Sequence, residues 1–349
     1  MTKRKSAYTR PLDIERGRID MNHGSGGRAM AQLVEELFAE ALANEYLAQG
    51  NDGAVLPPAN GRLVVSSDGH VVSPLFFPGG DIGSLAVHGT INDVAMMGAQ
   101  PLYLTASFIL EEGFPLADLR RIVVSMAEAS AAAGVLVVAG DTKVVEQGKG
   151  DGVFIATTGI GVVREGVNLS GSLARPGDRI LLSGTIGDHG MAILSRREGL
   201  EFDAPIVSDS VALHGLVAAM LESGAGLHVL RDPTRGGLAT TLNEITRQSG
   251  VGMLLQESAI PVAPVVAAAS EFLGLDPLYL ANEGKLVAIC APADAGRLLE
   301  IMQSHPLGGS AAIIGEVTQD PHGFVQMTTR LGGRRIVDWL TGEPLPRIC

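Results

Sequence analysis

Apolar and polar positions in the first half of the chain alternate between two periods. Residues 62–67 and 152–163 are short apolar runs of the kind found in buried strands. Residues 82–97 and 116–133 repeat apolar side chains at helical spacing, and a turn leads from the second segment into the apolar run 135–139. Strand, helix and strand therefore recur, and the pattern predicts an α/β or α+β fold.

The same alternation restarts after the loop 165–176. The expected elements are a strand at 179–184, a helix after Gly187, a helix at 211–222, a helix at 292–302 and a strand at 311–317. The restart predicts a domain boundary near residue 170. We expect four segments, at 1–18, 19–170, 171–337 and 338–349, with Trp339 as the last buried anchor of a polar tail.

Composition narrows the class of protein. A chain of 349 residues with 46% hydrophobic side chains is long enough for two domains, each with its own core. A formal net charge of −12 and an aromatic content of 4% argue against nonspecific nucleic-acid binding. No segment is apolar over the length that spans a bilayer, and the basic start, residues 1–13, has no apolar stretch after it. We expect a cytoplasmic enzyme that binds neither nucleic acid nor membrane.

The chain has two cysteines, too few for a disulfide framework or a zinc cluster within one chain. Cys290 ends the apolar run 286–290, which predicts a buried thiol in a strand. Cys349 is the last residue and follows Pro344 and Pro346, which keep the backbone extended. A prenylation signal needs three residues after the cysteine. Neither packing nor lipid attachment explains a terminal thiol, so we expect it to take part in chemistry.

A glycine-rich loop precedes the predicted helix 28–42. Its residues are His23, Gly24, Ser25, Gly26 and Gly27. Glycines before a helix N-terminus let backbone amides face an anion such as phosphate. Taken alone, such a loop is more often a tight connection, and the chain has no Walker sequence. The imidazole of His23 either orients this loop or touches phosphate.

Four aspartates stand beside glycine or at the ends of predicted elements. They are Asp52, Asp68, Asp93 and Asp141. Each alone is a usual turn former or helix cap, but the oxygens of all four together suit Mg²⁺. Carboxylates can surround a triphosphate only when divalent cations lie between them, and Lys143 can neutralise a phosphate oxygen directly. Asp81 is a further contact in this site or a turn residue.

These residues carry a resemblance to the HypE family of hydrogenase maturation proteins, in the superfamily of aminoimidazole ribonucleotide synthetase and selenophosphate synthetase. The likeness covers almost the whole chain. The segments that carry it are residues 23–27, 68 with 74–80, 92–95, 140–145, 187–190, 231–237, 282–285 and 344–349. The ending Pro-Arg-Ile-Cys separates the HypE family from its relatives, and the residues before 19 fall outside the pattern.

The resemblance implies a two-domain synthetase fold. It implies an N-terminal ATP-binding domain whose mixed sheet pairs with that of a second copy in a homodimer, a C-terminal α/β domain, and a mobile tail that carries Cys349. The implied reaction is the ATP-dependent dehydration of an S-carboxamide on Cys349 to a thiocyanate, which supplies cyanide ligands for the iron of nickel-iron hydrogenases. ATP and Mg²⁺ are the implied cofactors. The implied partners are a HypF-type carbamoyltransferase and a HypC and HypD complex that accepts cyanide.

The resemblance also implies a set of site residues. The catalytic side chains are Cys349 as the nucleophile, Glu283 as the base, and Lys143. The nucleotide-binding residues are His23, Gly24, Ser25, Gly26, Gly27, Asp68, Asp93, Asp141, Thr142 and Lys143. The metal ligands are Asp52, Asp68, Asp93 and Asp141. Without the resemblance, Glu283 is a solvated loop acid or a helix cap.

Several side chains and functions stay open. Arg231 and Arg235 either hold phosphate or the terminal carboxylate or form surface salt bridges, and His189 is expected to be a capping or packing residue. Another superfamily member, such as a selenophosphate synthetase or thiamine monophosphate kinase, would act on a diffusible substrate. The lack of a cysteine before position 290 argues against a selenophosphate synthetase. A nucleotide-regulated scaffold would use Cys349 only for docking, and Cys349→Ala would leave its ATP hydrolysis unchanged.

Overall fold

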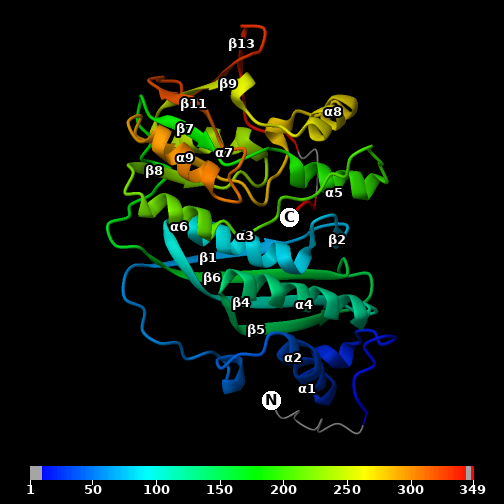
Figure 1. Ribbon diagram of the computed structural model, residues 1–349. Helices are drawn as coiled ribbons and strands as arrows, with labels where there is room; N and C mark the ends of the chain where they lie inside the picture. The colour runs from blue at the N-terminus through cyan, green and yellow to red at the C-terminus, as the bar shows by residue number, and fades with distance from the viewer. Residues whose placement is uncertain (1–9, 343–346) are drawn as a thin grey trace.

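The computed structural model describes residues 10–342 and 347–349, so Pro344 and Pro346, which the sequence predicts to be extended, lie outside the described part. The described chain forms two lobes that face each other, one from each half of the sequence (Figure 1). Each lobe contains a sheet and the helices that cover it. The prediction of a mixed α and β fold is confirmed.

The N-terminal lobe is built on a four-stranded sheet in the order β1-β6-β4-β5. Its strands are β1 (Leu63–His70), β4 (Ala99–Glu111), β5 (Leu136–Val145) and β6 (Val153–Val163), and a separate ribbon consists of β2 (Phe76–Phe77) and β3 (Gly80–Asp81). β4 and β5 are parallel and the other pairs are antiparallel, so the sheet is mixed. Along β4, alternate side chains such as Leu104, Ala106 and Phe108 are buried on one face.

Helices cover this buried face. They are α3 (Ile82–Met96), α4 (Leu116–Ala133), and a rod made of α1 (Arg28–Leu33), a π-helical turn (Val34–Phe38) and α2 (Ala39–Ala41). The periodic pattern predicts α4 correctly at both ends, and Gly134 ends it in the left-handed conformation, with φ 66°. The rod departs from the predicted single helix, because the wider π turn brings both Leu37 and Phe38 into the core.

The C-terminal lobe is built on a seven-stranded sheet in the order β13-β12-β9-β11-β7-β10-β8. Its strands are β7 (Arg179–Leu182), β8 (Leu227–Arg231), β9 (Gly252–Gln256), β10 (Val287–Cys290), β11 (Ala312–Thr318), β12 (Val325–Thr328) and β13 (Arg334–Ile336). Its helices are α5 (Asp188–Glu198), α6 (His214–Glu222), α7 (Gly237–Ser249), α8 (Pro264–Leu273) and α9 (Ala295–Ser304). Short 3₁₀ turns lie at Met21–Gly24, Leu47–Gln49, Glu257–Ala259 and Pro277–Tyr279.

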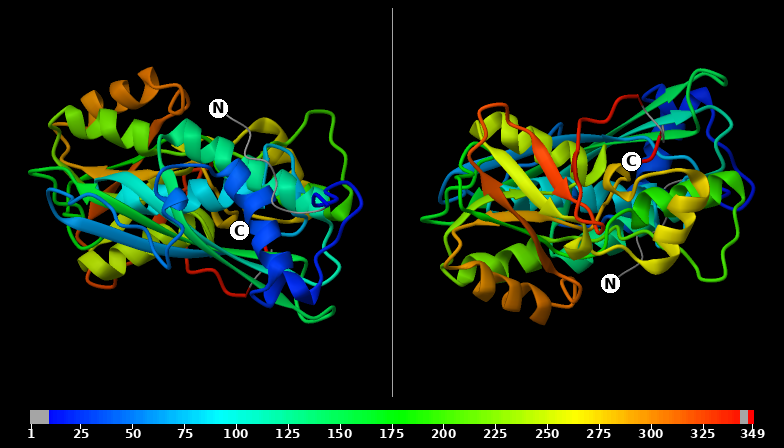
Figure 2. Two further views of the ribbon diagram at one scale, coloured as in Figure 1. Left: turned by 90° about the horizontal axis from the view of Figure 1, so that it is seen from below. Right: turned by 90° about the horizontal axis from the view of Figure 1, so that it is seen from above.

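Both faces of this second sheet are buried. Along β10, Val287 and Ile289 join a core with α7, whereas Ala288 and Cys290 join a core with α6 and α9. Views along the vertical direction of Figure 1 show α6 and α9 together on one side of the sheet (Figure 2). Cys290 is therefore a buried strand thiol, as the sequence predicts. Among the described residues, no helix combines the length and the apolar character needed to cross a membrane.

α3 lies between the two lobes and is buried on nearly all sides (Figure 1). Asp81 caps its N-terminus, because its Oδ1 accepts hydrogen bonds from the N–H groups of Gly83 (2.8 Å) and Ser84 (3.1 Å). Of the two roles that the sequence allows for Asp81, the structure shows the turn and cap role. The carboxylate of Asp81 binds the main-chain amides at the start of α3.

Asn92, in the middle of α3, connects the two lobes through a buried side chain with 1% exposure. Its amide group donates hydrogen bonds to the carbonyls of Val211 (3.0 Å) and Glu283 (3.2 Å). Its Oδ1 accepts a hydrogen bond from Leu213 N–H (2.7 Å). One asparagine of the N-terminal lobe therefore satisfies three main-chain groups of the C-terminal lobe.

The end of the chain returns to the space between the lobes, where the label C stands in Figure 1. Val337 is buried, but Trp339 is 38% exposed. The prediction that Trp339 is the last buried anchor is wrong, because Val337 already fills the core position and the indole stays at the surface. Ile348 is buried instead, and it pairs with Val72 in an antiparallel bridge.

We expect Asn92→Ala to lower the free energy of unfolding by about 3 kcal/mol, because it leaves buried main-chain groups without partners. Equilibrium unfolding in urea measures this loss. Asn51→Ala, in an exposed bend, is the matched control and should change stability by no more than about 0.5 kcal/mol. Equal effects of the two substitutions would show that Asn92 does not hold the lobes together.

Candidate active site

The last three residues, 347–349, lie between the two lobes and contact both of them. We call this position of residues 347–349 the seat of the tail. Val71 N–H donates a hydrogen bond to an oxygen of the terminal carboxylate of Cys349 (3.1 Å), and Ser73 N–H donates one to the Arg347 carbonyl (3.1 Å). The side chain of Ile348 is buried and that of Cys349 is partly buried. The structure therefore shows the tail turned inward, with the terminal thiol between the lobes.

Glu283 lies beside this thiol and is buried, with 4% exposure. The Cys349 thiol lies beside the Glu283 carboxylate, close enough for each group to shift the pKa of the other. Burial raises the pKa of Glu283 well above its usual range, and the negative charges of Asp209, Asp232 and Asp68 raise it further. Within the described part of the chain, Oε1 of Glu283 has no hydrogen-bond partner. This carboxyl group is buried and faces sulfur, so it is not a solvated loop acid.

The segment that carries Glu283 is fixed by main-chain contacts. The carboxylate of Asp209 accepts hydrogen bonds from the N–H groups of Glu283 (3.0 Å) and Gly284 (3.2 Å) and from Nζ of Lys285 (3.1 Å). Just before it, Oδ1 of Asn282 accepts a hydrogen bond from a main-chain amide at the start of α5. These contacts therefore fix the main chain of the loop that carries Glu283.

The thiol of Cys349 is not a nucleophile in this position. Burial raises its pKa well above the usual value, and the Glu283 charge raises it further, while the Arg235 guanidinium acts in the opposite direction. The sulfur therefore stays protonated at neutral pH. A reaction in which the thiolate attacks another molecule requires the tail to leave its seat.

A second group of carboxylates lies next to the seat. Asp93 on α3 accepts a hydrogen bond from the Ser66 hydroxyl (2.7 Å) and is close enough to Asp68 for their charges to interact. Burial raises the pKa of Asp93. Burial and the Asp93 charge raise the pKa of Asp232 to about 7. Three carboxylates therefore share a region of unfavourable negative charge that a cation would relieve.

The Glu283 and Cys349 pair and the carboxylates of Asp68, Asp93 and Asp232 belong to one site. A methyl group added to Gly89 of α3 would lie 3.5 Å from Oδ2 of Asp68 and 3.9 Å from Oε2 of Glu283, so both carboxylates approach the same turn of the helix. The pKa of Arg235 is raised by the charges of Cys349, Asp68 and Glu283. Arg235 is thus the cation that faces the seat, whereas Arg231 pairs with Glu244.

The glycine-rich loop packs against β5, on the far side of the N-terminal lobe. A methyl group on Gly24 would lie 2.8 Å from Cβ of Val144, so only glycine fits there. Nδ1 of His23 accepts a hydrogen bond from Asp20 N–H (3.0 Å) within a capping box. The structure shows His23 in the orienting role. The exposed Lys143 on β5 forms an ion pair with Asp141 (2.7 Å).

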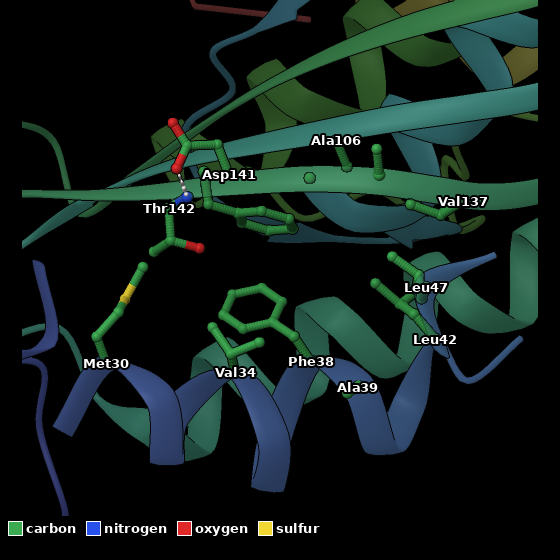
Figure 3. A pocket seen from close by; sticks show the side chains of 13 residues that line it. Met30, Val34, Phe38, Ala39, Leu42, Leu47, Ala106, Val137, Asp141 and Thr142 are labelled. Atoms are coloured by element: carbon green, nitrogen blue, oxygen red, sulfur yellow. Dashed lines mark hydrogen bonds between the residues drawn. The ribbon is translucent and has the colours of Figure 1, made fainter. Parts of the chain in front are cut away.

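An apolar cavity of about 190 Å³ adjoins this loop, between the N-terminal helical rod and the sheet (Figure 3). Its walls include Met30, Val34, Phe38, Leu42, Ala106, Phe108 and Val137, with Asp141 and Thr142 at one end. A flat, mostly apolar ring fits a cavity of this kind, and the polar end lies beside the glycine-rich loop. The predicted nucleotide residues His23, Gly24, Asp141, Thr142 and Lys143 are therefore neighbours.

The four predicted metal ligands are not gathered within one chain. Asp68 lies on β1 and Asp141 on β5, at opposite edges of the sheet, a separation of three strand spacings or roughly 14 Å. Asp52 lies in an exposed bend. Over residues 10–342 and 347–349, no three His, Cys, Asp or Glu side chains are placed to hold a metal ion. Nucleotide-bound Mg²⁺ needs one or two carboxylates plus phosphate oxygens, and the pair of Asp68 and Asp93 fits that requirement.

Lys143 is likewise far from the other two predicted catalytic residues, since β5 and β1 are opposite edges of the sheet. Asp232 was not among the predicted ligands, although it lies beside Asp93. The sequence feature that could have identified Asp232 is its position directly after strand β8, at the carboxyl end of an apolar run.

Comparison with known proteins agrees with this geometry. Residues 50–163 match the family model "AIR synthase related protein, N-terminal domain", and residues 175–328 match "AIR synthase related protein, C-terminal domain". The carbamoyl dehydratase HypE of Cupriavidus necator is 70% identical over 346 residues, which cover 99% of each chain. A crystal structure of the hydrogenase maturation protein HypE in complex with ATP has 50% identity and a TM-score of 0.91, covering 94% of this chain and 99% of that one.

A crystal structure of a HypE–HypF complex is also similar, with 54% identity and a TM-score of 0.78 over 88% of this chain and 99% of the matched one. The relatives span the same length as the chain and share both lobes. The chain belongs to the HypE family of carbamoyl dehydratases, within the AIR synthase related proteins.

Proposed function

We propose that this protein dehydrates an S-carboxamide on its own Cys349 to a thiocyanate, at the expense of ATP, and so supplies cyanide for the iron of a nickel-iron hydrogenase. The observation that carries the proposal is the position of the seated terminal thiol beside the buried carboxylate of Glu283. The Glu283 carboxyl group lies next to the sulfur, its pKa is raised, and its Oε1 has no hydrogen-bond partner among the described residues. It is therefore suited to take a proton from the nitrogen of a carboxamide on Cys349.

The chemistry balances in two steps. The carboxamide oxygen on Cys349 takes the γ-phosphoryl group, the bond to ADP breaks, and Glu283 takes one proton from nitrogen. The C–O bond to phosphate then breaks, the departing phosphate takes the second nitrogen proton, and a C≡N bond remains on sulfur. Burial of the seat keeps water from hydrolysing the phosphorylated carbon.

We assign the nucleotide to the apolar cavity and the glycine-rich loop. The cavity accepts the base, the amides of residues 24–27 face phosphate, and Lys143 neutralises phosphate charge. Mg²⁺ is assigned to Asp68 and Asp93, with Asp232 beside them, and when bound it would neutralise the charge of the transferring phosphoryl group. The ATP bound to the HypE structure that is 50% identical supports the nucleotide assignment.

We also propose a homodimer through the uncovered face of the N-terminal sheet. Leu63 (60%), Val65 (64%) and Ile109 (43%) are exposed apolar side chains of this sheet. Two copies packed face to face about an axis parallel to the strands would place β5 of one copy opposite β1 of the other. Such pairing would bring the nucleotide cavity of one subunit toward the carboxylates of its partner.

The partners follow from the chemistry of the tail. Because the seated thiol is protonated, we propose that a HypF-type carbamoyltransferase loads Cys349 while the tail is turned outward. The solved HypE–HypF complex supports this partner. A HypC and HypD complex is the proposed acceptor of cyanide. We place the reaction in the cytoplasm, since a free terminal thiol needs a reducing compartment.

The function is tested by mass spectrometry of the C-terminal peptide. The protein is first loaded by the carbamoyltransferase with carbamoyl phosphate and ATP, then separated from partner and nucleotide. We expect a carbamoyl group on Cys349 and the loss of one water from it only after MgATP is added back. Cys349→Ala should carry no modification, and Cys290→Ala should behave as the parent chain. Loss of water without ATP, or no carbamoyl group at Cys349, contradicts the proposal.

We expect Glu283→Gln to slow the ATP-dependent loss of water by about 100-fold or more, because the buried base is removed. The same substitution removes a negative charge that opposes the thiolate, so the pH profile of Cys349 alkylation should move to lower pH. Glu201→Gln, in an exposed loop, is the control and should leave both measurements unchanged. Unaltered dehydration in Glu283→Gln would remove Glu283 from the mechanism.

We expect Val65→Asp to convert the dimer to a monomer, because it puts a charge in the centre of the proposed apolar contact. Light scattering after gel filtration measures the mass. Phe272→Asp, at a side chain on α8 that is 79% exposed, is the matched control and should keep the parent mass. A dimer that persists in both variants places the interface elsewhere.

A further inference from the structure

His189 is a buried side chain of the C-terminal lobe that contacts the main chain of the seated tail. It is the second residue of α5 and is fully buried. Its ring packs edge-on against the ring of Phe77, with centroids 5.6 Å apart. Its Nε2 lies 2.7 Å from the Ile348 carbonyl oxygen, and its Nδ1 lies 2.7 Å from the Ser208 hydroxyl. Both ring nitrogens are therefore occupied, and one of them contacts the residue next to Cys349.

The direction of each hydrogen bond follows from the partners. A carbonyl oxygen can only accept a hydrogen bond. Nε2 of His189 therefore carries the proton and donates a hydrogen bond to the Ile348 carbonyl. Nδ1 of this neutral imidazole then accepts from the Ser208 hydroxyl, and Ser208 Oγ accepts from Ser210 N–H (3.1 Å). The chain of donors runs in one direction, from Ser210 through Ser208 and His189 to the tail.

The same loop holds the base. Asp209 stands between the two serines, and its carboxylate accepts the hydrogen bonds from Glu283 and Gly284 that fix the loop of the base. Residues 208–210 therefore hold Glu283 on one side and, through His189, the Ile348 carbonyl on the other. The distance between the terminal sulfur and the carboxylate depends on both contacts.

The N-terminal lobe alone does not set this distance. Its polar contacts to the tail are main-chain hydrogen bonds beside Val72 and an ion pair between Asp151 and Arg347, and none of them reaches the carbonyl of Ile348. Arg197 of α5 adds a second anchor, because its guanidinium donates to the carbonyls of Ser73 and Arg347 (2.8 Å each). His189 contacts the carbonyl nearest to Cys349.

We propose that His189 is a positioning residue that recognises the seated tail by the carbonyl of residue 348 and so places the Cys349 sulfur against Glu283. The proposal rests on the proposed function, because it assigns His189 to the dehydration step. His189 itself touches no reacting atom. Its neutral Nε2–H form, held by Ser208, is the form that recognises the tail.

The test measures how often the tail leaves its seat, by the alkylation rate of Cys349 in the full-length protein. His189→Leu removes the donor, and we expect the rate to rise about 3- to 10-fold, as for the loss of one hydrogen bond. His189→Gln keeps a donor near the Nε2 position and should stay within about twofold of the parent rate. Phe77→Leu removes the ring contact but keeps the hydrogen bond, so it is the control for packing and should leave the rate unchanged.

Nitrogen NMR of the imidazole gives a second readout. We expect the Nε2–H tautomer of His189 in the full chain, and a change in its signals when residues 347–349 are deleted. Equal alkylation rates in His189→Leu and His189→Gln, or imidazole signals that do not change on deletion, overturn the proposal. If His189→Leu does not fold, Ser208→Ala takes its place, with a rise in rate expected and a parent rate overturning the proposal. Both readouts need neither ATP nor carbamoyl donor, so they can fail independently of the proposed function.

Discussion

The packing of both lobes on the buried helix α3 is the constraint on which the rest of the structure depends. α3 carries Asp93 toward the carboxylates and Asn92 toward the C-terminal lobe, where the Asn92 amide holds the carbonyl of Glu283. One helix therefore fixes the position of Glu283 relative to Asp93. Because the seat of the tail also lies between the lobes, a change in the packing of α3 would alter the position of the sulfur relative to the base.

The position of the terminal thiol bears on both steps of the proposed reaction. In its seat the Cys349 thiol is buried beside a carboxylate, and its pKa is too high for nucleophilic attack at neutral pH. The same burial suits the proposed dehydration, because a phosphorylated carboxamide must be kept from water while it loses phosphate. One position of the thiol therefore does not suit both proposed steps. A tail that is loaded outside the seat and dehydrated inside it, as we propose, would separate the two environments.

Much of the fold could be predicted from the sequence where a periodic pattern ends at a clear signal. α4 is the best example, since its apolar spacing and Gly134 define both ends. Trp339 could not be placed correctly, because its size suggests burial while Val337 already fills the core. The π turn in the N-terminal rod also lacks a sequence signal, since it depends on how Leu37 and Phe38 pack together.

The site was harder to predict than the fold. The segments around Glu283 and Cys349 could be recognised, and the structure places them in contact. Asp52, Asp68, Asp93 and Asp141 look alike in sequence, yet only Asp68 and Asp93 lie together, because the order of the strands decides which aspartates meet. His189 looked like a packing residue since its partner, the carbonyl of Ile348, is 159 residues away in the chain.

The seated tail places the Cys349 sulfur beside the side-chain carboxylate of Glu283 of the same chain. Cross-linking of a Glu283→Cys, Cys290→Ala variant with a short bifunctional thiol reagent tests this position directly, because the spacer of the reagent replaces the extra length of the glutamate side chain, which a direct disulfide could not span. We expect a cross-link between positions 283 and 349 within one chain, found by peptide mass spectrometry. No cross-link at these positions, or one that joins two chains, would contradict this placement.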